Sequence, residues 1–285
     1  MTLLRPLRLI FSALAYFLGI ASADYLGATI SPLAIALGLG WALFAQTSMN
    51  LLAEVFRPIN EPLNGLFGAE RVYLRDRLLL VSIGLLGLAA GCAYLLYLLG
   101  SIHMEALILL ALSLLIVLAY AVPPLKLARR GFGELLLAAH IGYIFPSLGF
   151  VLQSGEFHRL LPILALPVTM LALAYFLILD FSTFADDIKY ERVTLLTRLG
   201  WQRAIPLHHG LVIFAFLLLA AAPLLNISAA LLWPAFLALP FAILQIVMLH
   251  NISLGARPLW KPLATLSAAT FALTVYLLTF SLFLR

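Results

Sequence analysis

Nine long apolar segments constrain the fold of this chain more than any other feature of its sequence. Each has about 20 residues or more, the length that a helix needs to cross about 30 Å of hydrocarbon. The segments are continuous, whereas the strands of a membrane barrel alternate apolar and polar residues over about ten positions. We therefore predict an all-α, polytopic membrane protein of nine transmembrane helices, at residues 7–24, 30–55, 78–99, 104–122, 134–153, 159–184, 205–224, 228–249 and 262–284.

The composition agrees with this class. Of the 285 residues, 64% are hydrophobic and only 10% are charged, whereas about a quarter of the residues in a soluble domain are charged. No linker or low-complexity tract interrupts the pattern, so we expect one membrane domain over residues 1–285. The net charge of +5 is explained by cations in the loops, and we expect membrane lipids as neighbours, no nucleic-acid partner and no obligate protein partner.

The cations are distributed very unevenly between the two ends of the predicted spans. Fifteen of the 17 lysines and arginines precede the first span or lie in the loops after spans two, four, six and eight. By the positive-inside rule, the N-terminus and these loops are cytoplasmic, and the protein is a multi-pass protein of the cell membrane. Arg5 and Arg8 before an apolar run resemble a secretory signal, but eight more spans follow, so we expect the run to remain as the first span.

Oxygen-bearing side chains gather near the cytoplasmic ends of spans two and six. Asn50 and Glu54 are four residues apart and share one helix face, as do Asp180, Thr183 and Asp187. Ionisable groups at membrane depth usually face a polar cavity or a partner. Two such clusters on separate helices are typical of a site for a hard cation such as Mg²⁺. We predict Asn50, Glu54, Asp180 and Asp187 as metal ligands, with Glu61, Thr183 and Asp186 as further candidates.

A different interpretation of these acids stays open. They could solvate the helix ends, or form ion pairs with Arg57, Lys189 and Arg192 nearby in the sequence. A transporter is disfavoured. Transporters have broken helices near the middle of the membrane, whereas the polar residues of this chain gather at one end of the spans.

A basic segment with two prolines follows the fourth span. In Y120-A-V-P-P-L-K126 the prolines cannot continue the helix, and Pro123 also disfavours helical geometry at Val122. Lys126, Arg129 and Arg130 then emerge at the end of the spans where the acids lie. Tyr120 has the position of an aromatic anchor at the membrane interface.

Together, these motifs resemble the UbiA superfamily of intramembrane prenyltransferases. The resemblance rests on the nine spans, on Y120-A-V-P-P-L-K126 with R130-G-F-G-E134, and on Asp187 followed by T194-L-L-T-R-L-G200. It implies a helical bundle with active-site loops on the cytoplasmic side. It also implies Mg²⁺-dependent transfer from a prenyl diphosphate to an acceptor, often an aromatic ring of a quinone precursor.

The resemblance also assigns roles to residues. It implies catalytic roles for Tyr120, Lys126 and Asp187. Asn50 and Glu54 match the first two positions of the family's N-x-x-x-D-x-x-x-D pattern, but Pro58 occupies the third, and Thr183 replaces the first acid of D-x-x-x-D. The diphosphate would be bound by Lys126, Arg129, Arg130, Lys189 and Arg192.

The segment G131-F-G-E-L-L-L-A-A-H-I-G142 is similar to the naphthoate prenyltransferases of menaquinone synthesis, which favours an aromatic acceptor. Three alternatives stay open. One is another acceptor, either chlorophyllide-like or a glycerol-phosphate lipid. The others are a terpene cyclase of the same fold and a non-catalytic protein that binds prenyl lipids.

Overall fold

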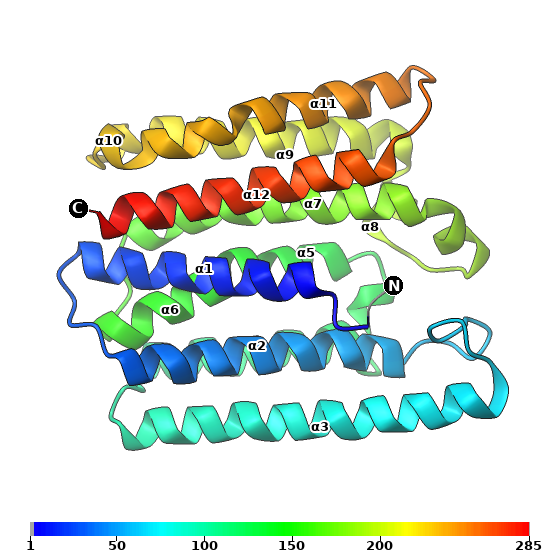
Figure 1. Ribbon diagram of the computed structural model, residues 1–285, viewed down its shortest axis with the longest axis horizontal. Helices are drawn as coiled ribbons and strands as arrows, with labels where there is room; N and C mark the ends of the chain where they lie inside the picture. Colours follow the sequence, from blue (N-terminus) through cyan, green and yellow to red (C-terminus); the bar gives the residue numbers. More distant parts are fainter. Residues whose placement is uncertain (1–2, 285) are drawn as a thin grey trace.

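The computed structural model describes residues 3–284 and confirms an all-α bundle (Figure 1). Nine helical segments in this range are long and apolar enough to cross a membrane. Several are built from consecutive helices, and α8 (Leu195–Leu199) and η1 (Leu127–Arg129) are short helices outside the spans. The spans are α1 (Pro6–Tyr25), α2 (Pro32–Val55), α3 (Gly68–Leu98), α4 (Met104–Ala121), α5 (Gly133–Ala139) with η2 (His140–Ile144) and α6 (Phe145–Ser154), α7 (Leu160–Lys189), α9 (Trp201–Ala221) with η3 (Ala222–Leu225), α10 (Ala229–Leu232) with η4 (Trp233–Ala238) and α11 (Leu239–Ser253), and α12 (Trp260–Phe283).

The helices begin and end where local chemistry requires. Pro32 occupies the first turn of α2, and Oγ of Ser31 caps that helix by accepting a hydrogen bond from N of Ala34 (3.3 Å). Helix α4 ends at Ala121, because Val122 adopts an extended conformation (φ −94°, ψ 137°) directly before Pro123. The prediction that the prolines end the fourth span is confirmed.

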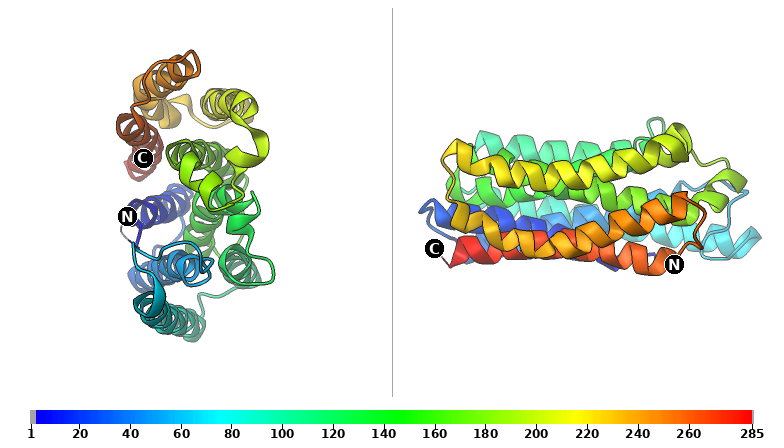
Figure 2. Two further views of the ribbon diagram at one scale, coloured as in Figure 1. Left: turned by 90° about the vertical axis from the view of Figure 1, so that its right-hand side faces the viewer. Right: turned by 90° about the horizontal axis from the view of Figure 1, so that it is seen from above.

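The helices run side by side, with the N-terminus and the C-terminal end of α12 at opposite ends of the bundle (Figures 1 and 2). Helix α1 packs on α6 and α12, α2 packs on α3 and α4, and α7 packs on α9 and α12. The fifth span is central, with 78% of its most apolar window buried, whereas only 17% of that of α3 is buried. Helix α3 therefore lies at the edge, where its apolar side chains suit contact with lipid.

Glycines allow α1 and α6 to pack closely. A Cβ atom on Gly19 would lie 1.9 Å from the carbonyl oxygen of Pro146, and one on Gly149 would lie 2.3 Å from that of Tyr16. Small residues permit such close backbone approach between membrane helices, where lipid removes the hydrophobic drive for association.

The helices extend beyond several of the predicted spans, and one span contains an irregular turn. Helix α3 begins at Gly68 rather than at residue 78, and α7 continues to Lys189 rather than ending at 184. An apolar run indicates the part of a helix at membrane depth, and the polar turns beyond it remain helical. The fifth span contains a π-helical turn in which N of Phe145 donates to O of His140. Pro146 cannot donate a hydrogen bond to the preceding turn, and a wider turn relieves the clash of its ring.

Candidate active site

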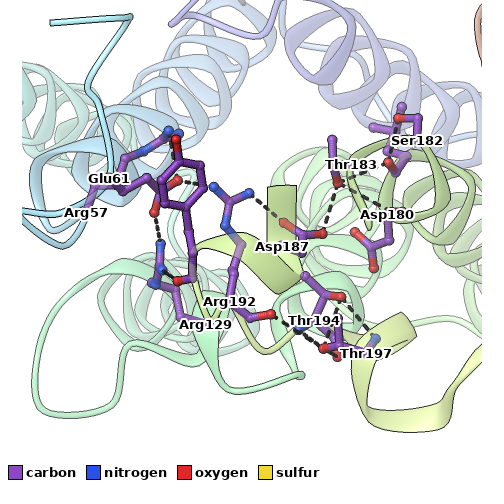
Figure 3. Close-up of polar contacts among 12 residues, drawn as sticks. Arg57, Glu61, Arg129, Asp180, Ser182, Thr183, Asp187, Arg192, Thr194 and Thr197 are labelled. Atoms are coloured by element: carbon purple, nitrogen blue, oxygen red, sulfur yellow. Dashed lines mark hydrogen bonds and ion pairs between the residues drawn. The ribbon is translucent and has the colours of Figure 1, made fainter. Parts of the chain in front are cut away.

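Most of the predicted site residues lie at one end of the bundle, which we call the basic end. It comprises loops 56–67, 122–132 and 190–194 and the adjoining helix termini (Figure 1). Helices α2 and α7 both end there, so the two acidic clusters face the same loops. Figure 3 shows the polar contacts between the α2 and α7 sides.

Glu61 is the centre of this network. Its side chain is 1% exposed, and Oε2 lies 2.5 Å from Nη1 of Arg129, while Oε1 lies 3.0 Å from Nη1 of Arg57 and also pairs with Arg192 (Figure 3). Burial opposes ionisation of Glu61, but the guanidinium group of Arg192, with those of Arg129 and Arg57, outweighs it and lowers the pKa. Glu61 is therefore a buried carboxylate shared by three arginines.

Arg71 holds the loop that carries Glu61. From the first turn of α3, its Nη2 donates to the carbonyl oxygens of Arg57 (2.8 Å) and Pro58 (2.7 Å), and its Nε donates to that of Glu61 (3.2 Å). Leu63 anchors the same loop by packing in an apolar cluster. In the sequence, Arg71 stands out only as one of the charges that set orientation, because no spacing rule connects it to these carbonyl groups.

The α7 side of the site contains Asp180, Thr183 and Asp187. Oγ1 of Thr183 donates to Oδ2 of Asp187 (3.0 Å), and Oδ1 of Asp187 lies 3.1 Å from Nη1 of Arg192 (Figure 3). That second contact is an ion pair without hydrogen-bond geometry. Oδ1 of Asp187 and Oδ2 of Asp180 are buried and accept no hydrogen bond from any described residue. Arg192 thus bridges Glu61 and Asp187, and Oδ2 of Asp180 remains without a hydrogen bond or an ion pair among the described residues.

The N-terminal residues complete the α2 side. Arg5 donates to Oε1 of Glu54 (2.8 Å), and Oε2 of Glu54 lies 2.5 Å from Nη2 of Arg57. Nη1 of Arg8 donates to Oδ1 of Asn50 (3.2 Å) and to Oη of Tyr120 (3.4 Å). Sequence reasoning placed Arg5 and Arg8 only among the flanking charges, because their proximity to the site depends on how α1 packs.

The segment after α4 contributes Lys126 and Arg129 but directs Arg130 elsewhere. Lys126 is half-buried. Burial and the charge of Arg129 lower its pKa, while Glu61 opposes the shift. Arg130 is exposed and donates to the carbonyl oxygen of Pro124 (2.9 Å). At Gly131, a positive φ of 74° allows its N to donate to O of Val193 (2.8 Å), which ties this segment to the α7–α8 loop.

Two predicted site residues besides Arg130 lie outside the network. Asp186 and Lys189 are exposed, and Nζ of Lys189 lies 5.0 Å from the ring centroid of Tyr190. Asp186 is the direct neighbour of Asp187, but the helical rotation of about 100° per residue turns it away from that face.

A buried polar chain runs from Asn50 into the bundle. Nε2 of Gln46 donates to Oδ1 of Asn50 (3.3 Å), and Oε1 of Gln46 lies 3.2 Å from Nδ1 of His140. Nε2 of His140 lies 2.8 Å from Oγ of Ser113, which accepts a hydrogen bond from Nε1 of Trp41 (3.4 Å). The chain connects α2, α4 and the π-helical turn, and it positions the Asn50 amide through its partners.

The charge balance of the basic end determines what it can bind. Glu54, Glu61 and Asp187 are the carboxylates that form ion pairs in this network. The cations outnumber them, even with Asp180 and the buried Glu134 counted. An excess of guanidinium groups suits an anion with several oxygens, such as a phosphate or diphosphate. The cations are Arg5, Arg8, Arg57, Arg129, Arg192 and Lys126.

A carboxylate can hold a metal ion here only through an oxygen that is free of other partners. Among residues 3–284, no three acidic, histidine or cysteine side chains form a preassembled metal site. On the α7 side, Oδ2 of Asp180 is free and Asp187 pairs with one arginine, Arg192, so these two carboxylates are the better fit to a hard cation. On the α2 side, both oxygens of Glu54 and of Glu61 are engaged by arginines.

Comparisons with known proteins agree with this geometry. The model of the UbiA prenyltransferase family matches residues 69–259. No curated protein matches the chain. Among solved structures, a UbiA homolog from Archaeoglobus fulgidus has 17% identity and a TM-score of 0.67, covering 97% of this chain and 98% of its own.

Two further solved structures are similar over nearly the whole chain. The Archaeoglobus fulgidus UbiA homolog bound to DMAPP and Mg²⁺ has 17% identity and a TM-score of 0.62, covering 97% of both chains. A structure described for digeranylgeranylglyceryl phosphate synthase has 18% identity and a TM-score of 0.65, covering 99% of this chain and 98% of its own.

Proposed function

Because the chain belongs to the UbiA prenyltransferase family, we propose that it transfers a polyprenyl group from a prenyl diphosphate to an aromatic acceptor that resembles a quinone precursor. The observation that carries this proposal is the arginine network around Glu61, beside the buried carboxylates of Asp180 and Asp187. This arrangement suits a diphosphate, which needs several charge-assisted hydrogen bonds.

In the proposed reaction, the bond between the allylic carbon and the diphosphate oxygen breaks, and its electron pair leaves with the diphosphate. The acceptor carbon forms the new bond, and its proton is lost to water. Arg129, Arg192 and Lys126 would stabilise the charge that develops on the leaving group. Electrostatic stabilisation of this kind supplies much of the rate enhancement in many enzymes. Tyr120, oriented by Arg8, would lie beside the reacting carbon.

A Mg²⁺ ion is part of this proposal, since a solved relative is described as bound to DMAPP and Mg²⁺. Asp180, through its free Oδ2, and Asp187 would hold it, and the hydroxyl group of Thr183 would orient Asp187. The ion would supply electrostatic stabilisation of the departing diphosphate. Asn50, Glu54 and Glu61, the predicted ligands on the α2 side, would act through the arginines that they hold.

We propose the orientation from the distribution of charge. Fifteen of the 17 lysines and arginines precede the first span or lie in the loops after spans two, four, six and eight, so the basic end would face the cytoplasm of a cell membrane. A water-soluble diphosphate group and its Mg²⁺ would then reach the site from the cytoplasm, while the prenyl chain stays in lipid.

The test is a transfer assay with the full-length protein in lipid nanodiscs. Geranylgeranyl diphosphate and Mg²⁺ would be combined with a dihydroxynaphthoate, a hydroxybenzoate or a prenylglyceryl phosphate, and products identified by mass spectrometry. We expect a prenylated aromatic product that is lost in Asp187→Asn. Cyclised product without an acceptor would indicate a terpene cyclase, and saturable binding without turnover would indicate a binding protein.

A second acceptor class is a glycerol-phosphate lipid. It is favoured by the structural similarity to digeranylgeranylglyceryl phosphate synthase over 99% of this chain. Product from the prenylglyceryl phosphate alone, with none from the aromatic compounds, would replace the aromatic acceptor with this one.

A further inference from the structure

The acidic groups on the two sides of the site are engaged differently. On the α2 side, Glu54 lies between Arg5 and Arg57, with both carboxylate oxygens in ion pairs. Glu61 is likewise engaged through both oxygens, by Arg57 and Arg192 at one and Arg129 at the other. These carboxylates are 5% and 1% exposed in their side chains, so their charge is neutralised within the protein rather than by solvent.

On the α7 side, the carboxylates are engaged by fewer arginines. Oδ2 of Asp180 is buried and has neither a hydrogen bond nor an ion pair among the described residues. Oδ1 of Asp187 lies 3.1 Å from Nη1 of Arg192, in an ion pair without hydrogen-bond geometry. A buried carboxylate oxygen without a donor is costly, and a bound cation is one of the few groups that can compensate for it. The α7 side therefore has room for a metal ion.

A metal ion on the α2 side would face two obstacles. It would have to displace guanidinium groups from Glu54 or Glu61, and it would add charge where cations already exceed carboxylates. A guanidinium group, by contrast, binds phosphate oxygens in a bidentate manner and stays charged at any physiological pH. Each arginine held by Glu54 or Glu61 keeps further N–H donors for an incoming anion.

We propose that guanidinium groups take the place of metal ions on the α2 side of this site. The chain then binds a prenyl diphosphate with one divalent cation, held by Asp180 and Asp187, and retains diphosphate affinity without any cation. This inference rests on the proposed function and specifies the metal content of the same site. Arg57 is the central residue, because it pairs with both Glu54 and Glu61.

Two binding measurements on the full-length protein in detergent test this. First, Mn²⁺ binding in the presence of inorganic pyrophosphate would be counted by electron paramagnetic resonance. We expect one Mn²⁺ per chain, lost in Asp187→Asn and retained in Glu54→Gln. Second, binding of geranylgeranyl diphosphate would be measured with Mg²⁺ and with EDTA. We expect affinity in EDTA to fall by no more than about tenfold, the loss of one charged contact.

The arginine contribution is tested by Arg57→Gln. This variant should weaken binding in EDTA by about tenfold or more, since it loses one charged contact to the diphosphate. The matched control is Arg75→Gln, because the side chain of Arg75 is 41% exposed and pairs only with its neighbour Asp76 among the contacts described for it.

The contrary outcomes separate this inference from the proposed function. Two Mn²⁺ ions per chain, or binding in Mg²⁺ that vanishes in EDTA, would overturn the inference and leave the proposed function standing. No binding of geranylgeranyl diphosphate under either condition would overturn both. The wild-type protein alone gives these results, so a variant that fails to fold does not affect them.

Discussion

Oε2 of Glu61 lies 2.5 Å from Nη1 of Arg129, although 68 residues separate the two in the chain. This ion pair joins the loop after α2 to the segment after α4, and Arg192 extends it to the loop after α7. Three cytoplasmic-facing loops of the proposed topology are thus connected through one carboxylate. The following predictions concern that connection and the groups around it.

Glu61→Gln should destabilise the protein and reduce its activity. Removing the carboxylate leaves three guanidinium groups without their shared counter-ion, and breaking a buried ion pair typically costs about 3 kcal/mol or more. Thermal unfolding in detergent measures the first effect and prenyl transfer the second. Glu61→Asp, which keeps the charge, is the matched control. Equal melting temperatures for Glu61→Gln and the wild type would contradict the structural role.

Arg71→Gln should loosen the loop that carries Glu61. It removes donors to three carbonyl oxygens, and each hydrogen bond from a charged group contributes roughly 2 kcal/mol. We expect faster proteolysis within residues 56–67 and a higher KM for the prenyl diphosphate. Arg75→Gln, four residues further along α3, should match the wild type in both assays. A loop as resistant to protease as the native one would refute this role of Arg71.

The alkaline limb of the pH–activity profile should depend on Lys126. Burial and Arg129 lower the pKa of Lys126, so its positive charge is lost as pH rises through a value below the usual lysine pKa of about 10.4. Diphosphate binding then weakens, and kcat/KM falls. Lys126→Arg should move this limb to higher pH, because guanidinium keeps its proton. Lys189→Arg should leave it in place, and an unmoved limb in Lys126→Arg would contradict the assignment.

Tyr120→Phe should reduce kcat/KM by about tenfold, the value of a hydrogen bond to a charged group. The hydroxyl group accepts from Nη1 of Arg8 at 3.4 Å, so Phe would leave this guanidinium less well oriented. In a double-mutant cycle with Arg8→Gln, the two losses should be less than additive. Tyr94→Phe, at a position 62% exposed on α3, is the control. Full additivity would show that the two residues act independently.

His140→Leu should lower the melting temperature, because it leaves the buried Oε1 of Gln46 and Oγ of Ser113 each without one partner. An unsatisfied buried polar group costs about 2 kcal/mol. His103→Gln, at an exposed position near the other end of the bundle, should have little effect. A variant at His140 as stable as the wild type would mean that water or rearrangement satisfies both groups.

Several features of this protein follow from the sequence alone because they depend on local properties of the chain. Apolar runs long enough to cross hydrocarbon predict the nine spans, and proline geometry predicts the end of α4. Helical spacing places Thr183 and Asp187 on one face, where they form a hydrogen bond. The polar extensions of α3 and α7 were missed, because apolar length indicates membrane depth and not helix length.

The tertiary structure decided which charges meet. Arg5 reaches Glu54 and Arg8 reaches Tyr120 only because α1 packs beside α2 and α6, and Arg71 contacts its loop through the start of α3. The sequence left open whether the acids hold metal or pair with arginines. Packing treats the two sides differently: it brings guanidinium groups onto both oxygens of Glu54 and Glu61, whereas Asp187 pairs with Arg192 alone and Oδ2 of Asp180 has no partner among the described residues. Contacts between residues tens of positions apart depend on how helices pack, and no local spacing rule encodes them.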